Sequence, residues 1–237
     1  MVAVGVDRFR RQGYERFDAC FTRAEAAALL AAIGAVSSLD EDNDLSQGPM
    51  RFVSNVYRRS AEVQRFLLDP RILSIVGALV GPSAWCRWDQ AVCKGPGAGT
   101  FPWHQDNGYT RLGREHLQIW VALTDAPAQR GGLLVEPGGH RSARSHRWVG
   151  NHVEVIDPPA EALALDASAG DVIAFSSFLP HATGPNDTLD DRWAYVAEFL
   201  PLDAVDESVE RPWFVLTSEG TAVGRFLDQP PTRVASS

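Results

Sequence analysis

The chain has few cysteines and no long apolar run. Its three cysteines, Cys20, Cys86 and Cys93, are odd in number, and no two of them form a Cys-x-x-Cys pair. A disulfide framework and a thiolate zinc site are therefore not indicated, and buried filler is the more typical role of such residues. The most apolar stretch, Ala24 to Val36, is thirteen residues long and contains Glu25. Because a membrane span needs about 20 apolar residues, the sequence predicts no transmembrane helix.

The chain also has fewer basic residues than acidic ones. Twenty-two Lys and Arg residues stand against thirty Asp and Glu residues, which gives a formal net charge of −8. Sequence-independent binding to phosphate backbones needs the opposite balance, so nucleic acid is not the expected partner. The first residues lack the long apolar region and small-residue cleavage site of a secretory signal. We therefore expect a cytoplasmic protein.

The first third of the chain carries helix signals. Thr22 and Glu25 have the spacing of a capping box, in which each side chain can satisfy a backbone amide at the helix start. Asp69 followed by Pro70 places a capping side chain before a residue that suits the first helical turn. With Ser60 as a further cap, these signals predict helices over 22–35, 60–68 and 71–80, and a loop over 40–49.

From residue 83 onward the pattern changes to short Trp-, Val-, Ile- and Phe-rich runs separated by turn residues. Such spacing predicts strands. We place them at 84–93, 117–124, 132–136, 153–156, 171–175 and 193–200, with weaker ones around His104, Leu163 and Trp213. About eight short strands suit a double-stranded β-helix, the jelly roll of cupin-like proteins, whose interior can hold a ligand. We expect a mainly β single domain over 1–237, with a helical buttress (1–82), a jelly-roll core (83–200) and a C-terminal extension (201–237).

The most informative motif lies in the segment 101–109, Phe-Pro-Trp-His-Gln-Asp-Asn-Gly-Tyr. On an extended backbone, residues two apart face the same side, so His104 and Asp106 can converge on one point. A lone His-x-Asp is a weak signal, and a third ligand is required. His181, at the end of an apolar run that leads into a turn, is the best candidate. Two imidazoles and one carboxylate form the facial triad of non-haem Fe(II) oxygenases.

Arg192 follows His181 by eleven residues and begins the next predicted strand. After a hairpin its guanidinium could return to the metal end of the barrel. Its planar fork matches a carboxylate with two parallel hydrogen bonds. We therefore expect Arg192 to anchor a dicarboxylate cosubstrate.

These motifs resemble those of the phytanoyl-CoA dioxygenase family of Fe(II)- and 2-oxoglutarate-dependent oxygenases. The resemblance runs to about Leu200 and rests on Lys94-Gly95-Pro96, on Trp103 to Asp106, on the strand 117–125, on the turn 131–140, and on His181 and Arg192. It implies that His104, Asp106 and His181 bind iron and that Arg192 binds 2-oxoglutarate. It further implies cosubstrate contacts for Gln90, Trp120 and Thr183, and aligns Asn55 loosely with a polar family position. Gly139 stands where the family commonly has serine.

The resemblance implies hydroxylation of a small-molecule metabolite by O₂, with 2-oxoglutarate converted to succinate and CO₂. The same ligands could serve desaturation, epoxidation, cyclisation or epimerisation. Two alternatives stay open: a cupin-like metalloenzyme that does not use 2-oxoglutarate, and a non-catalytic β-sandwich binding module. A jelly roll with exposed sheet edges is compatible with a monomer or a homodimer.

Other charged residues are expected to have structural or solvent-facing roles. We expect His116 to be a solvent-facing cap. Arg141, Arg144 and Arg147 form a local basic cluster that could receive an anionic substrate group, although a solvated loop is favoured.

Overall fold

The computed structural model describes residues 3–37, 48–110 and 112–228. Residues 40–47 of the predicted loop lie outside this range. The four α-helices within it are α1 (Val6–Gln12), α2 (Arg23–Ser37), α3 (Ala61–Leu67) and α4 (Pro70–Leu79). None of these described helices is long and apolar enough to cross a membrane.

Three of the helices begin where their capping residues predict. Thr22 and Glu25 form the capping box of α2, with the Thr22 amide 2.7 Å from Glu25 Oε2 and the Glu25 amide 3.2 Å from Thr22 Oγ1. Ser60 accepts a hydrogen bond from the Val63 amide and begins α3. Asp69 accepts one from the Arg71 amide, with proline in the first turn of α4. Local sequence therefore determines these helix starts.

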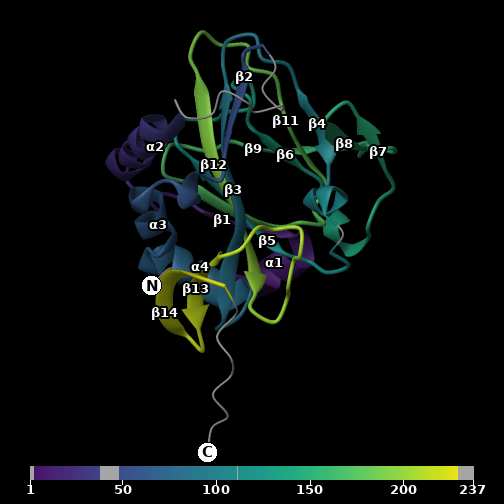
Figure 1. Ribbon diagram of the computed structural model, residues 1–237. Helices are drawn as coiled ribbons and strands as arrows, with labels where there is room; N and C mark the ends of the chain where they lie inside the picture. The colour runs from purple at the N-terminus through teal and green to yellow at the C-terminus, as the bar shows by residue number, and fades with distance from the viewer. Residues whose placement is uncertain (1–2, 38–47, 111, 229–237) are drawn as a thin grey trace, which may run out of the picture.

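Most strands of the described chain belong to two facing sheets (Figure 1). The larger sheet has eight strands and its main path runs β1-β10-β5-β12-β3-β13-β14, while β2 also pairs with β3. These strands are β1 (Tyr14–Phe17), β2 (Met50–Ser54), β3 (Ala84–Lys94), β5 (Leu117–Ala122), β10 (Val172–Ser176), β12 (Arg192–Pro201), β13 (Trp213–Ser218) and β14 (Thr221–Leu227). Every pairing is antiparallel.

The smaller sheet has four strands in the order β4-β11-β6-β9. They are β4 (Phe101–His104), β11 (His181–Thr183), β6 (Leu133–Val135) and β9 (Leu163–Leu165). A separate hairpin pairs β7 (His146–Val149) with β8 (His152–Val155). Two antiparallel sheets closed over one interior confirm the predicted mainly β, jelly-roll fold.

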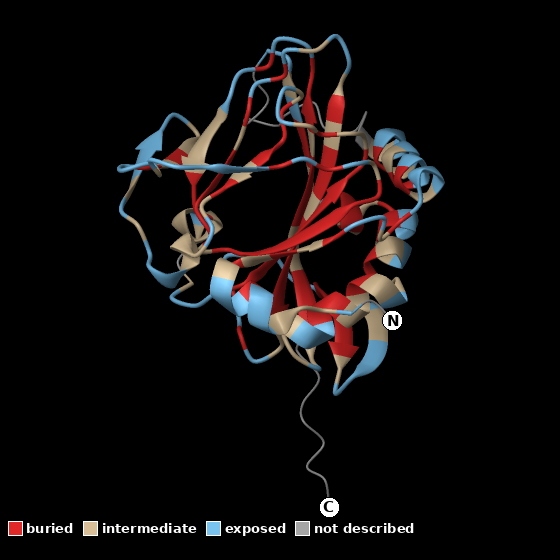
Figure 2. Cartoon of the chain, turned by 180° about the vertical axis from the view of Figure 1, so that it is seen from behind, coloured by how far each residue is buried: buried red, intermediate tan, exposed pale blue. Residues whose placement is uncertain are grey.

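The central strands of the larger sheet are buried on both faces. On β5, Ile119 and Val121 pack in one cluster with helix residues such as Ile33 and Ile72. Their neighbours Trp120 and Ala122 pack in another cluster with residues of the smaller sheet. Because side chains alternate across a strand, the helices cover the outer face and leave the inner face for the barrel interior. Figure 2 shows these strands in red, with exposed helix surface outside them.

Several elements differ from the sequence prediction. Helix α1 and strands β1, β2, β7, β11 and β14 were not predicted. His181 begins β11 after a turn, and β11 and β12 lie in different sheets. The connection to Arg192 is therefore a crossing between sheets and not the expected hairpin. The strands that were not predicted have three to seven residues, and such short runs give too weak an alternation to be recognised without their partners.

Gly139, the departure from the family pattern, has a packing reason. It opens the short 3₁₀ turn Gly139–Arg141. A Cβ atom at this position would collide with the Glu136 carboxylate and lie 2.9 Å from Pro180 Cδ. Glu136 in turn forms an ion pair with Arg144. Glycine leaves room for that pair, so the turn forms without serine.

Asp89 is a buried carboxyl group in the framework of the larger sheet. Its Oδ2 accepts hydrogen bonds from the Tyr57 amide at 2.9 Å and the Tyr195 hydroxyl at 2.7 Å. Burial raises the pKa of Asp89 from 3.8 to about 7. The folded state then holds this proton more tightly than the unfolded chain, and the resulting stability is full below pH 4 and lost as pH rises through 7.

We therefore expect Asp89→Asn to flatten the pH dependence of stability. In urea unfolding at pH 4 to 8, the free energy of unfolding should fall less with rising pH in this variant than in the wild type. Parallel curves for the two proteins would contradict this assignment.

Candidate metal centre

The three predicted ligands meet in the structure. His104 ends β4, Asp106 begins the 3₁₀ turn Asp106–Tyr109, and His181 begins β11. Strands β4 and β11 pair so that His181 lies directly opposite His104. One Asp106 oxygen is 3.6 Å from His104 Nε2, and the other is 3.8 Å from His181 Nε2. Within the described residues, this is the group of ligand atoms close enough to share a metal ion.

Both imidazoles are held with Nε2 toward the centre. His104 Nδ1 lies 2.8 Å from the Pro102 carbonyl, and His181 Nδ1 lies 2.9 Å from the Leu179 carbonyl. A carbonyl can only accept, so each Nδ1 carries the proton and each Nε2 presents a lone pair. Such hydrogen bonds to the remote nitrogen fix the ring orientation of metal-binding histidines.

Burial favours the uncharged imidazoles that a metal needs. It lowers the pKa of His104 to about 3, with a further contribution from His181, and lowers the pKa of His181 to about 4. Burial also raises the pKa of Asp106 to about 7. An unscreened carboxylate is costly here, and a bound cation would offset that cost.

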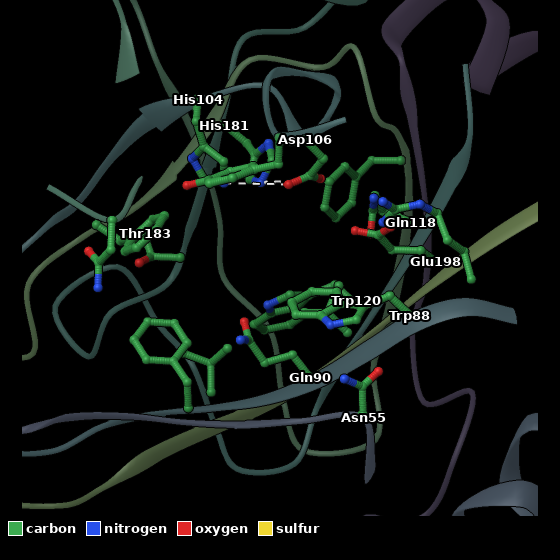
Figure 3. A pocket seen from close by; sticks show the side chains of 18 of the residues that line it. Asn55, Trp88, Gln90, His104, Asp106, Gln118, Trp120, His181, Thr183 and Glu198 are labelled. Atoms are coloured by element: carbon green, nitrogen blue, oxygen red, sulfur yellow. Dashed lines mark hydrogen bonds and ion pairs between the residues drawn. The ribbon is translucent and has the colours of Figure 1, made fainter. Parts of the chain in front are cut away.

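All the predicted site residues line one cavity of about 800 Å³. Figure 3 shows His104, Asp106 and His181 together on one side, with Trp120 and Gln90 facing them across the cavity. Gln90 donates a hydrogen bond to Ser54 Oγ at 3.0 Å, and Asn55 lines the same wall with a left-handed backbone (φ 54°). A volume of this size is typical of small-molecule sites.

Arg192 lies at one end of this cavity and is almost fully buried. Within the described structure, the Arg192 side chain makes one hydrogen bond, from Nη1 to the Val92 carbonyl at 3.3 Å. Its Nε and Nη2 atoms are buried without a partner in the described structure. A buried guanidinium with two unpaired donors is costly unless an acceptor binds there.

Lys94, the single lysine of the chain, is fully buried close to Arg192. It lies opposite Arg192 on the neighbouring strand. Its Nζ donates to Thr183 Oγ1 at 2.9 Å and to the Gly184 carbonyl. Burial, with the Arg192 charge beside it, lowers the pKa of Lys94 to about 7. The Arg192 guanidinium and the Thr183 hydroxyl thus both border the cavity where a carboxylate is expected.

The opposite end of the cavity holds polar residues that sequence reasoning missed: Arg87, Gln118 and Glu198. Gln118 precedes Trp120 by two residues, so strand alternation alone could have placed it on the same face. Glu198 shares a face with Arg192 for the same reason. His116 lies beside them with its Nε2 3.5 Å from Glu198 Oε2. Its side chain is fully buried, so the expectation of a solvent-facing cap is wrong.

The basic cluster at 141–147 is engaged elsewhere. Arg144 pairs with Glu136, and Arg147 pairs with Glu154 at 3.0 Å. Arg141 donates to the Arg11 carbonyl at 2.9 Å. The lining of the cavity includes none of these three arginines among its described residues. Their charges therefore supply no argument for an anionic substrate.

Comparison with known proteins agrees with this geometry. A model of the phytanoyl-CoA dioxygenase family matches residues 9–194. The chain is 28% identical over 167 residues to the peroxisomal phytanoyl-CoA dioxygenase of Mus musculus, a match that covers 63% of this chain and 49% of the mouse protein. It is 25% identical over 195 residues to the methylphosphonate hydroxylase of Gimesia maris, covering 77% of this chain and 74% of that protein. The chain thus spans about half the length of the mouse relative.

The fold also matches solved structures. The epimerase SnoN, in complex with Fe³⁺, alpha-ketoglutarate and nogalamycin RO, superimposes with a TM-score of 0.72 at 20% identity, covering 92% of this chain and 93% of SnoN. The family match spans most of the chain and includes the metal triad. The chain belongs to the phytanoyl-CoA dioxygenase family of Fe(II)- and 2-oxoglutarate-dependent oxygenases.

Proposed function

We propose that this protein hydroxylates a small molecule with O₂, using Fe(II) held by His104, Asp106 and His181 and converting 2-oxoglutarate to succinate and CO₂. The observation that carries the proposal is the convergence of these three ligands on one side of a cavity that is also lined by Arg192, whose Nε and Nη2 atoms have no partner in the described structure. The donor set is that of the facial triad, which leaves part of the iron coordination sphere to other ligands.

The residues at the Arg192 end fit 2-oxoglutarate. The two unpaired guanidinium nitrogens of Arg192 suit the distal carboxylate of the cosubstrate, since they can donate parallel hydrogen bonds. Thr183, which lines the cavity and accepts a hydrogen bond from Lys94, offers a hydroxyl to the same carboxylate. Trp120 and Gln90 line the cavity between this end and the far wall, where they can pack against bound cosubstrate. SnoN, which has the same fold, is known with alpha-ketoglutarate bound.

When bound, the iron and 2-oxoglutarate would supply the oxidising power for attack on a C–H bond. The protein's own contribution is to bind, orient and exclude water. His104 and His181 present fixed lone pairs, and Arg192 fixes the direction of the cosubstrate. The cavity wall then determines which substrate carbon faces the triad.

The two alternatives make different predictions. A cupin-like enzyme that does not use 2-oxoglutarate would leave Arg192 with a structural role, but a structural arginine would normally be fully hydrogen bonded. A non-catalytic binding module would need no neutral imidazoles directed at a carboxylate. The unpaired Arg192 nitrogens and the triad geometry both favour the oxygenase.

The decisive experiment is anaerobic calorimetry with Fe(II) followed by 2-oxoglutarate. We expect saturable binding of Fe(II), and 2-oxoglutarate binding that depends on the metal. Addition of O₂ with a substrate should release succinate. Iron binding without 2-oxoglutarate binding would support the cupin-like alternative, and absence of both would support the binding module.

A further inference from the structure

The inner face of the larger sheet is organised in rows across three adjacent strands. Glu198 on β12 pairs with Gln118 on β5 and with Trp88 on β3. Two residues along, Val196 pairs with Trp120 and Gln90, and Arg192 pairs with Lys94 at the far end. Arg192 and Glu198 are six residues apart on one strand face, which corresponds to roughly 20 Å. This side of the cavity therefore carries charged residues toward both ends, with Val196, Trp120 and Gln90 between them.

A β-bulge adds a charged residue to the Glu198 row. The register of β12 with β3 shifts between Glu198 and Phe199, whose partners are Trp88 and Cys86. Arg87 is the extra residue. In a bulge, two residues oppose one and the local alternation is broken. Both Arg87 and Trp88 consequently line the cavity.

Gln118 in this row is fully buried and has no partner. Neither its Oε1 nor its Nε2 forms a hydrogen bond within the described structure. Figure 3 shows Gln118 next to Glu198 on the Asp106 side of the cavity. Leaving a buried donor and acceptor unpaired is unfavourable for the folded protein. Such a group is expected where a ligand supplies the missing partners.

The charge at this end is predominantly negative. Arg87 is held by two carboxylates, Glu198 and Asp206, each at 2.6 Å. Burial lowers the pKa of the neighbouring His116, which favours its neutral form. The single positive charge of Arg87 is therefore outnumbered by the carboxylates of Glu198 and Asp206. The Nε and Nη1 atoms of Arg87 are already bonded to these carboxylates and are not free to bind a ligand. This environment favours a ligand group that donates a hydrogen bond over one that carries negative charge.

Aromatic side chains make up much of the remaining lining. Tyr109 packs against His104 and Phe175 against His181, while Trp88 and Trp120 line the opposite side of the cavity (Figure 3). Flat aromatic walls pack well against a ring or another rigid apolar group. The triad faces Trp120 and Trp88 across the cavity (Figure 3), so a C–H bond of a group packed on these rings can face the triad.

We propose that Gln118, Glu198 and Arg87 form the substrate-recognition subsite, and that the substrate is an apolar, ring-containing molecule with a hydroxyl or amino group. The proposal rests on the oxygenase function above. The Gln118 amide and the Glu198 carboxylate accept the donated hydrogen, while the Gln118 amino group donates to a hydroxyl oxygen. The ring packs on Trp88 and Trp120, which directs its far side toward His104 and Asp106.

Comparison of two equally buried glutamines, Gln118 and Gln105, tests whether the unpaired Gln118 amide serves to bind a ligand. Gln105 is also fully buried, but it donates to the Ser142 and Phe178 carbonyls and accepts from the Arg144 amide. In ligand-free protein we expect Gln118→Leu to raise the melting temperature by about 2–4 °C, because an unpaired buried amide is removed. Gln105→Leu should lower it by at least as much. A loss of stability in both variants would make Gln118 structural and overturn the proposal.

Binding is tested with matched probes on one scaffold: naphthylmethanol, naphthylmethylamine, naphthoate and methylnaphthalene. Calorimetry is done without oxygen, in protein loaded with Fe(II) and 2-oxoglutarate. We expect the alcohol or the amine to bind at least tenfold more tightly than the other two. Gln118→Leu should remove this preference, and so should Glu198→Gln, which keeps the shape of the side chain but not its charge.

The two proposals fail in different ways. Absence of 2-oxoglutarate binding in the wild type contradicts the oxygenase function and is seen before any probe is added. Normal 2-oxoglutarate binding with no probe preference, or with preference for naphthoate, contradicts the subsite alone. Unchanged 2-oxoglutarate affinity in Gln118→Leu, together with loss of probe preference, supports both.

Discussion

Titration of Fe(II) into His104→Ala without oxygen should give at least about 100-fold weaker binding than in the wild type. Loss of a hydrogen-bonding partner outside the coordination sphere already costs 10- to 100-fold in metal affinity, and removal of a ligand should cost more. His104 Nε2 is one of three ligand atoms that meet within 4.8 Å of one another. The remaining imidazole and carboxylate cannot complete the facial set, so succinate formation should fall to background.

The matched control is His140→Ala. His140 lies in the turn 139–141, with its Nε2 3.2 Å from the Arg10 carbonyl. It does not belong to the metal triad. Iron affinity should stay within twofold of the wild type in this variant. Retained stoichiometric iron in His104→Ala would show that the ion binds elsewhere and would contradict the assignment of the triad.

Arg192→Ala should separate cosubstrate binding from metal binding. We expect Fe(II) affinity to be retained and the Kd for 2-oxoglutarate to rise by about 100-fold. Truncating one partner of a buried, hydrogen-bonded charge pair costs about 2–5 kcal/mol, and each 1.4 kcal/mol is tenfold in affinity. The two measurements can be made in one anaerobic titration.

Arg192→Lys and Arg144→Ala serve as controls for the cosubstrate anchor. Lysine keeps the charge but loses the planar fork, so its 2-oxoglutarate affinity should lie between those of Arg192→Ala and the wild type. Arg144 pairs with Glu136 and donates to the Asp157 carbonyl, and it is not among the described residues that line the cavity, so its removal should leave that affinity unchanged. Equal Kd values in wild type and Arg192→Ala would refute the anchoring role.

The sequence predicted the elements whose signals are local. Capping residues located the starts of α2, α3 and α4, and apolar runs between turn residues located the long strands β3, β5 and β12. It did not predict β1, β2, β11 or β14. Strands β1, β2 and β14 lie at edges of the larger sheet and β11 lies in the smaller sheet, and all of them except β14 pair with strands distant in the chain. Their own residues carry too little periodicity to identify them.

The ligand types and the spacing of His104 and Asp106 were evident from the sequence, and these predicted the chemistry. That His181 meets them depends on the register of β11 with β4, which places the two histidines opposite each other. The polar end of the cavity that holds Gln118, Glu198 and Arg87 depends on two features of strand pairing. Gln118 pairs with Glu198, and the β-bulge places Arg87 at the cavity. Strand register and bulges are set by long-range packing across the sheets, so only the tertiary structure could determine which buried polar groups share the cavity with the metal ligands.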